Sequence, residues 1–479
     1  MKNIYKTGFF VLLASSLVFT ACKKDYFDEL NQNPNQVTKP TLAALLATST
    51  SKMGINSYTV AANTAPYVQY TANPTANAAS DIYETIDFSG MWDAIYFAMA
   101  DLKQLKAAAI EESSSEYIGA ANVMLAYNLN LANDLWGDIP YSEAFDPKNF
   151  YPKYDNQQAV YTAALALLDE AIVELSKTDA TVKLNTASDL IYGATGAANQ
   201  RANWLKLAQG LKARMLIKVS KTNTFSAANV LDAVSKSFVS NADDAGMATF
   251  PTRNNWATVA RNNASLTLGG WLSEQFIDHL NGKTYGILDP RIKKITDLTV
   301  NGVYIGTTNG AGNKGPGNNT IKDENYIAIS SPWTSDTSPL LIMTFAELKF
   351  IEAEAAFNTD KTRAYNAYLA GIAANMDKLQ VPAAEKAVYL ADPSVAVGAA
   401  ALTKELIFKE KYIATYLNPE AFNDVRRNNF NYKDFTLPVG AVLPSFIRRL
   451  DYPLVAERNK NGANVPNDPP RTTRLWWDQ

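Results

Sequence analysis

Apolar residues recur at intervals of three and four positions through most of the chain after residue 40. Between residues 117 and 136 the recurring positions are Ile118, Ala121, Leu125, Leu129, Ala132 and Trp136. This spacing places the side chains on one face of a helix, and Gly137 and Pro140 then predict where that helix ends. Comparable stripes run through residues 158–175, 204–215, 342–355, 365–379 and 402–417. The pattern therefore predicts a mainly α-helical fold.

Amphipathic stretches joined by short turns are typical of stacked helical hairpins of the tetratricopeptide kind. The sequence has no strict repeat of about 34 residues, so it shares the pattern of those repeats without their signature. Between about residues 221 and 340, Gly, Asn, Thr and Pro become more frequent and the apolar runs become short. We expect a loop-rich insert with short strands there, packed on the helical scaffold and carrying recognition residues.

The first 22 residues indicate an export signal. Lys2 and Lys6 form a basic start, residues 8–19 are almost entirely apolar, and small residues precede Cys22, the only cysteine. A run of about a dozen apolar residues is shorter than the roughly 20 that a spanning helix needs. We therefore predict a lipoprotein signal peptide at residues 1–21, cleavage before Cys22 and acylation of that cysteine. The alternative is an unmodified thiol behind an ordinary signal peptide.

Acyl chains on Cys22 would hold the mature protein on a membrane. Polar residues and turn formers follow this cysteine, which predicts a lipidated tether at residues 22–40 and a folded body at residues 41–479. No apolar stretch of the body approaches spanning length, so the predicted membrane attachment depends on the lipid alone.

The composition argues against several kinds of partner and chemistry. With 19% charged residues and a formal net charge of −3, the chain offers no basic surface for nucleic acid. One cysteine and one histidine, His279, cannot form a multi-histidine or cysteine-rich metal site or an internal disulfide. We predict no metal and no cofactor. A catalytic triad would have to use His279, which we expect instead to be a hydrogen-bonded or surface imidazole.

Two motifs suggest chemistry that their context does not favour. Residues 310–315 match the GxGxxG fingerprint of dinucleotide-binding proteins, but Pro and Gly follow where that fingerprint needs a helix, so a flexible surface loop is the better interpretation.

Glu347 and Glu354 lie seven positions apart on one predicted helix and could serve as the paired acids of a glycosidase. The alternation of apolar and acidic residues around them favours solvated or structural acids on an amphipathic surface helix.

Aromatic residues in polar surroundings are the strongest candidates for binding. Flat aromatic faces beside amide side chains suit the C–H faces and hydroxyls of sugar rings, and they suit peptides as well. The predicted ligand-binding residues are Trp333, Trp256, Tyr70, Tyr83, Tyr67 and Asn73. Trp333 is the expected main anchor. The alternative is that these rings pack in the core, which is what we expect of Trp92, Trp136, Trp204 and Trp271.

Seven segments match a family pattern in their order and spacing. They are LNQNPN (30–35), WDAIY (92–96), LWGDIPYSEA (135–144), DLIYG (189–193), WLKLA with LKAR (204–214), a helix with an Ala-Glu-Ala core (347–356) and NPEAFNDVRR (418–427). Together with the acylation-type Cys22, they resemble the SusD/RagB family of nutrient-binding outer-membrane lipoproteins from Bacteroidetes, particularly its SusD-like branch. The resemblance covers nearly the whole chain.

This resemblance implies a SusD-like fold, in which a less regular portion packs on tetratricopeptide-like helical hairpins. It implies a non-enzymatic role, which is to capture an oligosaccharide, or in some relatives a peptide, and deliver it to a SusC-like TonB-dependent transporter. It also implies a lipid anchor in the outer membrane, with the protein facing the cell exterior. Two alternatives remain. One is a surface glycoside hydrolase that uses paired carboxylates on an all-helical scaffold, and the other is a structural subunit that plugs a transporter without contacting the nutrient.

Overall fold

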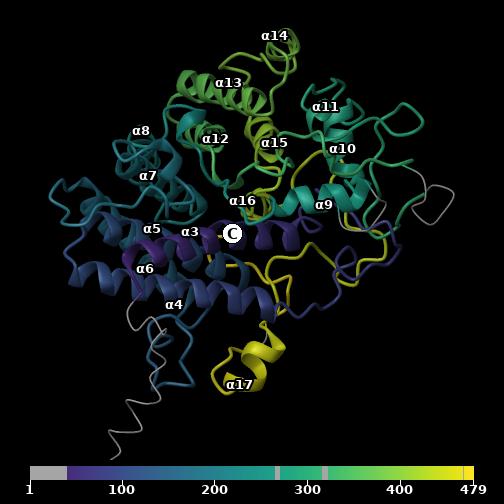
Figure 1. Ribbon diagram of the computed structural model, residues 1–479. Coiled ribbons are helices and arrows are strands. Elements are labelled where there is room, and N and C mark those ends of the chain that lie inside the picture. The colour runs from purple at the N-terminus through teal and green to yellow at the C-terminus, as the bar shows by residue number, and fades with distance from the viewer. Residues whose placement is uncertain (1–39, 265–269, 315–321, 468) are drawn as a thin grey trace, which may run out of the picture. The chain divides into compact units, whose positions relative to one another are not determined.

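The computed structural model describes residues 40–264, 270–314, 322–467 and 469–479 (Figure 1). The predicted signal peptide at residues 1–21, the acylated Cys22 and all of the predicted tether except Pro40 lie outside these residues and stay predictions. From Leu42 to Gln479 the chain forms one unit of tertiary contacts. Its secondary structure is mainly helical, which confirms the fold class that the apolar stripes predict.

Six helices build the first half of this unit. They are α3 (Leu42–Thr64), α4 (Ser89–Glu111), α5 (Ser115–Trp136), α6 (Gln157–Ser176), α7 (Gln200–Lys218) and α8 (Ala227–Ser235). Each helix packs against the next one in the sequence, so the helices form successive hairpins (Figure 1). α5 is buried along almost its whole length because α3, α4, α6 and α7 all contact it. The helix predicted over residues 117–136 is thereby confirmed.

Five further helices form a second group. They are α12 (Phe345–Ala356), α13 (Lys361–Lys378), α14 (Ala383–Ala391), α15 (Lys404–Ala414) and α16 (Glu420–Arg427). α12 contacts α13 and α15 and also α7 and α8, so it joins the two groups of helices. The predicted stripes over residues 365–379 and 402–417 correspond to α13 and α15, and the stripe over residues 342–355 corresponds to α12 except for its first position, Ile342, which lies in the strand Leu340–Met343.

The helix that carries Glu347 and Glu354 lies in the interior, so the expectation of a surface helix is wrong. Nε of Arg214 lies 2.6 Å from Oε1 of Glu347, and Nη1 of Arg427 lies 2.6 Å from Oε1 of Glu354. All four side chains are buried. The two acids are structural groups, because each carboxylate forms an ion pair with a buried arginine.

A less regular portion connects the two helical groups. It contains β1 (Ala245–Met247), α9 (Asn255–Ala264), α10 (Glu274–Asn281), α11 (Ile292–Ile295) and β2 (Leu340–Met343), with the short 3₁₀ turn η2 (Asn241–Asp243) before β1. β1 and β2 pair antiparallel, with Ala245 opposite Met343, and this pairing closes the two ends of the insert. In its described residues this portion contains the short helices α9, α10 and α11 as well as the loops and short strands that the composition predicts.

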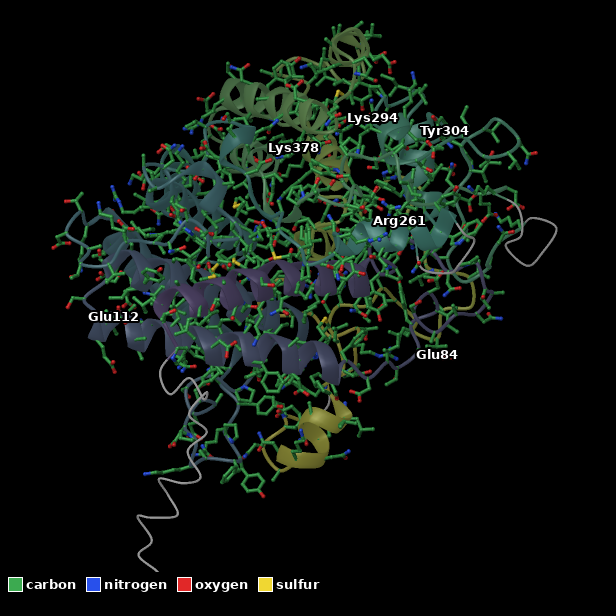
Figure 2. All side chains as sticks on the ribbon, viewed as in Figure 1. Glu84, Glu112, Arg261, Lys294, Tyr304 and Lys378 are labelled. Atoms are coloured by element: carbon green, nitrogen blue, oxygen red, sulfur yellow. The ribbon has the colours of Figure 1, made fainter. Side chains whose placement is uncertain are left out.

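Ion pairs tie this portion to the scaffold and to itself, and Figure 2 labels one residue of each pair. Lys378 at the end of α13 lies 2.9 Å from Oδ2 of Asp244, which immediately precedes β1. Arg261 of α9 lies 2.9 Å from Oδ1 of Asp336, in the segment that leads to β2.

The chain after α16 returns to the first group of helices and ends with the π-helical turn η3 (Leu454–Arg458), the short helix α17 (Asn459–Asn461) and an irregular tail. The Leu450 amide donates to the Leu135 carbonyl at 2.8 Å, and the indole N–H of Trp136 donates to the Asp451 carbonyl at 3.0 Å. In the part of the chain described, no helix combines the length and apolarity needed to cross a membrane.

Candidate ligand-binding pocket

The five aromatic side chains predicted to bind ligand are buried. Trp333 and Trp256 are each 4% exposed, and Tyr83 is fully enclosed. The expectation of loop rings exposed for stacking is therefore wrong. Direct contact between these rings and a ligand stays a prediction, which substitution of Trp333 tests.

Hydrogen bonding inside the loop explains why Trp333 turns inward. The Thr334 hydroxyl donates to the Ala328 carbonyl at 2.5 Å, and the Ser338 hydroxyl donates to the Pro332 carbonyl at 2.6 Å. The hydroxyl groups that made the loop look solvent-facing are thus satisfied within it, and the indole packs in the core. The ring of Trp256 packs edge-on against Tyr58, with centroids 4.8 Å apart.

The three predicted tyrosines anchor the segment that follows α3. Tyr67 and Tyr83 pack edge to face, with ring centroids 5.8 Å apart. The Tyr70 hydroxyl donates to the Tyr412 carbonyl of α15 at 2.5 Å. These contacts attach residues 67–83 to the helical scaffold, so the three tyrosines hold the backbone of this segment in place.

Asn73 is the one predicted ligand residue that is not fully buried. Its backbone N–H donates to Oδ2 of Asp81 at 2.9 Å, and its Oδ1 accepts from the Thr75 amide at 2.9 Å. Asn73 lies with Asn63, Ser80 and Asp81 in the wall of a polar pocket of about 200 Å³.

His279 of α10 is a buried, neutral imidazole. Its Nε2 lies 2.6 Å from Nε2 of Gln275 and 3.2 Å from the Lys433 carbonyl oxygen. Burial lowers the pKa of His279 to about 4, so the ring is uncharged at neutral pH. This confirms the expected hydrogen-bonded imidazole.

The described part of the GxGxxG motif is a docked loop and not the flexible loop expected. Gly310 has φ +80°, and a Cβ atom at this position would lie 2.0 Å from the Val439 carbonyl oxygen. The Gly310 carbonyl accepts from the Asn77 amide at 2.9 Å, and the Val439 amide donates to the Asn309 carbonyl at 3.0 Å. The glycine therefore allows three distant segments, around residues 77, 310 and 439, to interlock. Gly315 lies outside the described residues.

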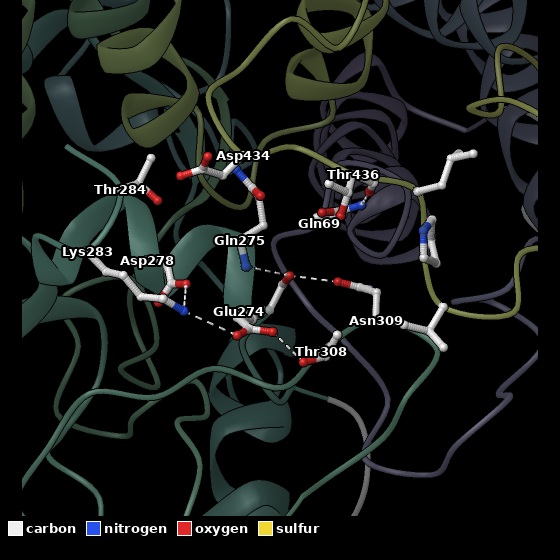
Figure 3. A pocket seen from close by; sticks show the side chains of 14 residues that line it. Gln69, Glu274, Gln275, Asp278, Lys283, Thr284, Thr308, Asn309, Asp434 and Thr436 are labelled. Carbon is white, nitrogen blue, oxygen red and sulfur yellow. Dashed lines mark hydrogen bonds and ion pairs between the residues drawn. The ribbon is translucent and has the colours of Figure 1, made fainter.

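A polar pocket of about 270 Å³ opens beside these interlocked segments (Figure 3). Its lining side chains come from the start of α10, from the loop that follows α10, and from segments near Gln69, Asn309 and Thr436. In Figure 3, Gln69 and Thr436 lie together on one side, and Asp278 and Lys283 lie on the opposite side. We refer to this cavity as the α10 pocket.

Ser273 connects the start of α10 to the segment around Asn309 in the wall of the α10 pocket. Its hydroxyl caps α10 by accepting the Gln275 amide at 3.3 Å, and it donates to Oδ1 of Asn309 at 2.7 Å. Nδ2 of Asn309 donates to the Thr71 carbonyl at 2.9 Å, and the Ser273 amide donates to the Tyr70 carbonyl at 3.0 Å. The segment that the sequence singled out at Tyr70 therefore supports the pocket through its backbone.

The pocket carries more negative than positive charge. Three carboxylates, of Glu274, Asp278 and Asp434, line it together with one lysine, Lys283. Nζ of Lys283 lies 2.6 Å from Oδ2 of Asp278 and 3.4 Å from Oε1 of Glu274. Burial opposes ionisation of Glu274, but the Thr308 hydroxyl bond and nearby Lys314 and Lys283 hold its pKa below the usual value. Across the described residues, no group of three or more His, Cys, Asp or Glu is placed to hold a metal ion.

Sequence reasoning missed this pocket because its parts are far apart in the chain. Gln69, Glu274, Thr308 and Asp434 meet only in the folded protein. The available signals were local: Ser273 before an amphipathic helix, and the Gly-rich run at residues 309–313. Neither signal indicates which segments come together.

The protein is thus a mainly helical scaffold with a polar pocket in its less regular portion. Solved structures share this fold. A SusD/RagB family protein from Bacteroides thetaiotaomicron is 23% identical, with a TM-score of 0.74 over 92% of this chain and 99% of that chain. A SusD homologue from Bacteroides uniformis is 21% identical, with a TM-score of 0.74 over 91% of this chain and 99% of that chain.

A chitin-binding SusD homologue from Flavobacterium johnsoniae is 22% identical, with a TM-score of 0.74 over 91% of this chain and 98% of that chain. The chain belongs to the SusD-like family described as "Starch-binding associating with outer membrane", whose pattern it matches over residues 34–453. No curated protein sequence matches the chain.

Proposed function

We propose that this protein is a lipid-anchored protein of the outer membrane that binds an oligosaccharide in the α10 pocket and delivers it to a SusC-like TonB-dependent transporter. The observation that carries the proposal is membership of a starch-binding, outer-membrane-associated family over residues 34–453. The shared fold of a chitin-binding homologue supports a glycan as the ligand class.

The chemistry of the α10 pocket suits a polyhydroxylated ligand. Carboxylates, amides and hydroxyls line it, and hydroxyl groups of a sugar both donate to and accept from such groups. The volume of about 270 Å³ is at the small end for ligand sites, so the pocket would hold one end of an oligosaccharide while the remainder stays outside. No Trp, Tyr or Phe is among the described residues that line it, so hydrogen bonding would hold the sugar.

The lipid anchor is proposed from the sequence. Acylation of Cys22 after the apolar run at residues 8–19 would attach the mature chain to the membrane, with residues 22–40 as the tether. Export to the outer membrane then places the body beside a transporter on the cell exterior.

Calorimetric titration of the purified protein with starch and chitin oligosaccharides, cellotriose and short peptides tests the proposal. We expect heat of binding with at least one glycan and an intact glycan afterwards. Thr436→Trp should fill the α10 pocket and lower the affinity at least about tenfold, whereas Thr162→Trp on the exposed face of α6 should not. Absence of binding to every glycan, or release of cleaved sugar, would contradict the proposal.

A further inference from the structure

Two buried amides in the wall of the α10 pocket present only a hydrogen-bond acceptor to a ligand. Gln69 and Gln275 line it and are 4% and 8% exposed. Nε2 of Gln69 donates to the Thr436 carbonyl at 2.7 Å, and Nε2 of Gln275 donates to the Lys433 carbonyl at 3.0 Å. These bonds fix which end of each amide is the nitrogen, so the remaining end is a carbonyl oxygen. Within the described residues, neither Oε1 atom accepts a hydrogen bond.

Asp434 adds an acceptor that carries a full charge. Its side chain is exposed at the pocket and makes no hydrogen bond or ion pair with any residue that the structure describes. Its backbone has φ +62°, a conformation that Asp and Asn adopt more readily than most residues. The left-handed backbone conformation of Asp434 therefore places its carboxylate at the pocket, where no described Lys or Arg forms an ion pair with it.

The donors near the pocket are already engaged. Lys283 bridges Asp278 and Glu274, and the Thr308 hydroxyl donates to Glu274. Lys314 lies 3.4 Å from Oε2 of Glu274, and Lys433 donates to the Thr284 carbonyl at 2.6 Å. The hydroxyls of Thr284 and Thr436 can rotate to accept as well as donate. Donors on a ligand would therefore find more open partners in this wall than acceptors would.

We propose that the α10 pocket receives the ammonium group of an amino sugar with a free amine. The inference rests on the function proposed above and names the sugar class for that site. An ammonium group has three donors and no acceptor, which matches a wall formed by two amide oxygens and an unpaired carboxylate. A neutral hydroxyl can donate only one hydrogen bond to these acceptors and carries no charge to pair with Asp434, and an acidic sugar would be repelled by the three carboxylates.

Three trimers with the same β-1,4 linkage test the proposal by calorimetric titration: glucosamine, N-acetylglucosamine and glucose. At about pH 6, where the amine is protonated, the glucosamine trimer should bind at least about tenfold more tightly than either neutral trimer. Added salt should reduce this difference, because the carboxylate of Asp434 is exposed to solvent.

Asp434→Asn removes the charge but keeps the shape and tolerates the same backbone conformation. We expect it to weaken glucosamine trimer binding about tenfold and to weaken glucose trimer binding much less, because only the glucosamine trimer loses a charge pair. Asp232→Asn on α8, which lies on the opposite side of Figure 1 from α10, should change neither.

Failure of this inference is distinct from failure of the proposed function. Equal affinity for the glucosamine and glucose trimers, with both lost in Thr436→Trp, would overturn the amino-sugar inference and leave the glycan site in place. Tighter binding of tri-lysine than of the glucosamine trimer would also overturn it, because the ligand would then be a peptide amine. Binding of none of the sugars would overturn the proposed function and this inference together.

Discussion

At Trp333 the flanking sequence indicates an exposed side chain, whereas the folded structure buries it. Ser, Pro and Thr surround the ring in sequence, which is typical of a surface loop. In the structure these hydroxyls bond within the loop and the indole enters the core. Local polarity therefore predicts the loop correctly but cannot predict which way its largest side chain points.

Trp333→Ala should lower the free energy of unfolding by about 3–5 kcal/mol, because it leaves a cavity in the core. Urea unfolding followed by circular dichroism measures this. Phe150→Ala is the matched control, since the Phe150 ring is 79% exposed and its loss should cost little. Wild-type stability of Trp333→Ala combined with lost glycan affinity would show that the ring contacts ligand after all.

Glu420 is a buried acid with an unusual environment. Burial raises its pKa from 4.5 to about 7, although Arg214 opposes this shift. Nε of Arg214 lies 3.8 Å from Oε2 of Glu420 and is 2.6 Å from Glu347, its closer partner. Nδ2 of Asn423 donates to Glu420 at 2.9 Å.

Between pH 4.5 and about 7 the folded protein keeps the proton on Glu420, whereas the unfolded chain releases it. The free energy of unfolding should therefore fall as pH rises through this window, by on the order of 2–3 kcal/mol from this group. Urea unfolding of Glu420→Gln at several pH values should show a smaller fall than the wild type. His279 shifts stability in the opposite direction below its ordinary pKa, and it is present in both proteins, so their difference isolates Glu420. An identical pH dependence of the two would contradict the assignment.

At the scale of elements, the sequence predicts what is local. The stripes over residues 117–136 and 158–175 correspond to α5 and α6, because a helix face is defined within one stretch of chain. α10 was less visible because it has only eight residues, Glu274–Asn281. The α10 pocket could not be predicted at all, since its wall depends on the register in which the segments near Gly310 and Val439 dock.

Gly310→Ala tests that docking, with Gly302→Ala as its control. Both glycines have positive φ, of +80° and +72°, so both substitutions carry a conformational cost of about 1 kcal/mol. Only at Gly310 would the new Cβ meet a backbone atom, 2.0 Å away, whereas nothing lies within 4 Å at Gly302. We expect Gly310→Ala to lose a further 1–3 kcal/mol or so of stability and to weaken glycan binding. Equal effects of the two substitutions would show that the close approach is unimportant.

At the scale of the whole molecule, the helical groups act as a scaffold for one irregular insert. Buried ion pairs between α7, α12 and α16 link the two groups. β1 and β2 close the insert, and the segment after α16 completes the wall of the pocket. The resemblance to SusD-like proteins predicted this plan from short motifs spread along the chain, whereas the ligand residues could not be transferred by position.

Cys22→Ala tests the proposed attachment of the molecule to the membrane. Without the acylated cysteine, the protein should leave the outer-membrane fraction while the circular dichroism of the body stays unchanged, because the unit of tertiary contacts begins at Leu42. Cell fractionation in a strain without the transporter measures this. Retention of the variant in the membrane fraction would contradict a lipid anchor.

The most direct test of the binding site is an experimental structure with a bound glycan. We expect the sugar in the α10 pocket, with donor groups within hydrogen-bonding distance of Gln69 Oε1 and the Asp434 carboxylate, and with the core positions of Trp333 and Trp256 unchanged. A sugar found elsewhere, such as in the pocket beside Asn73 or stacked on a displaced Trp333, would contradict the site.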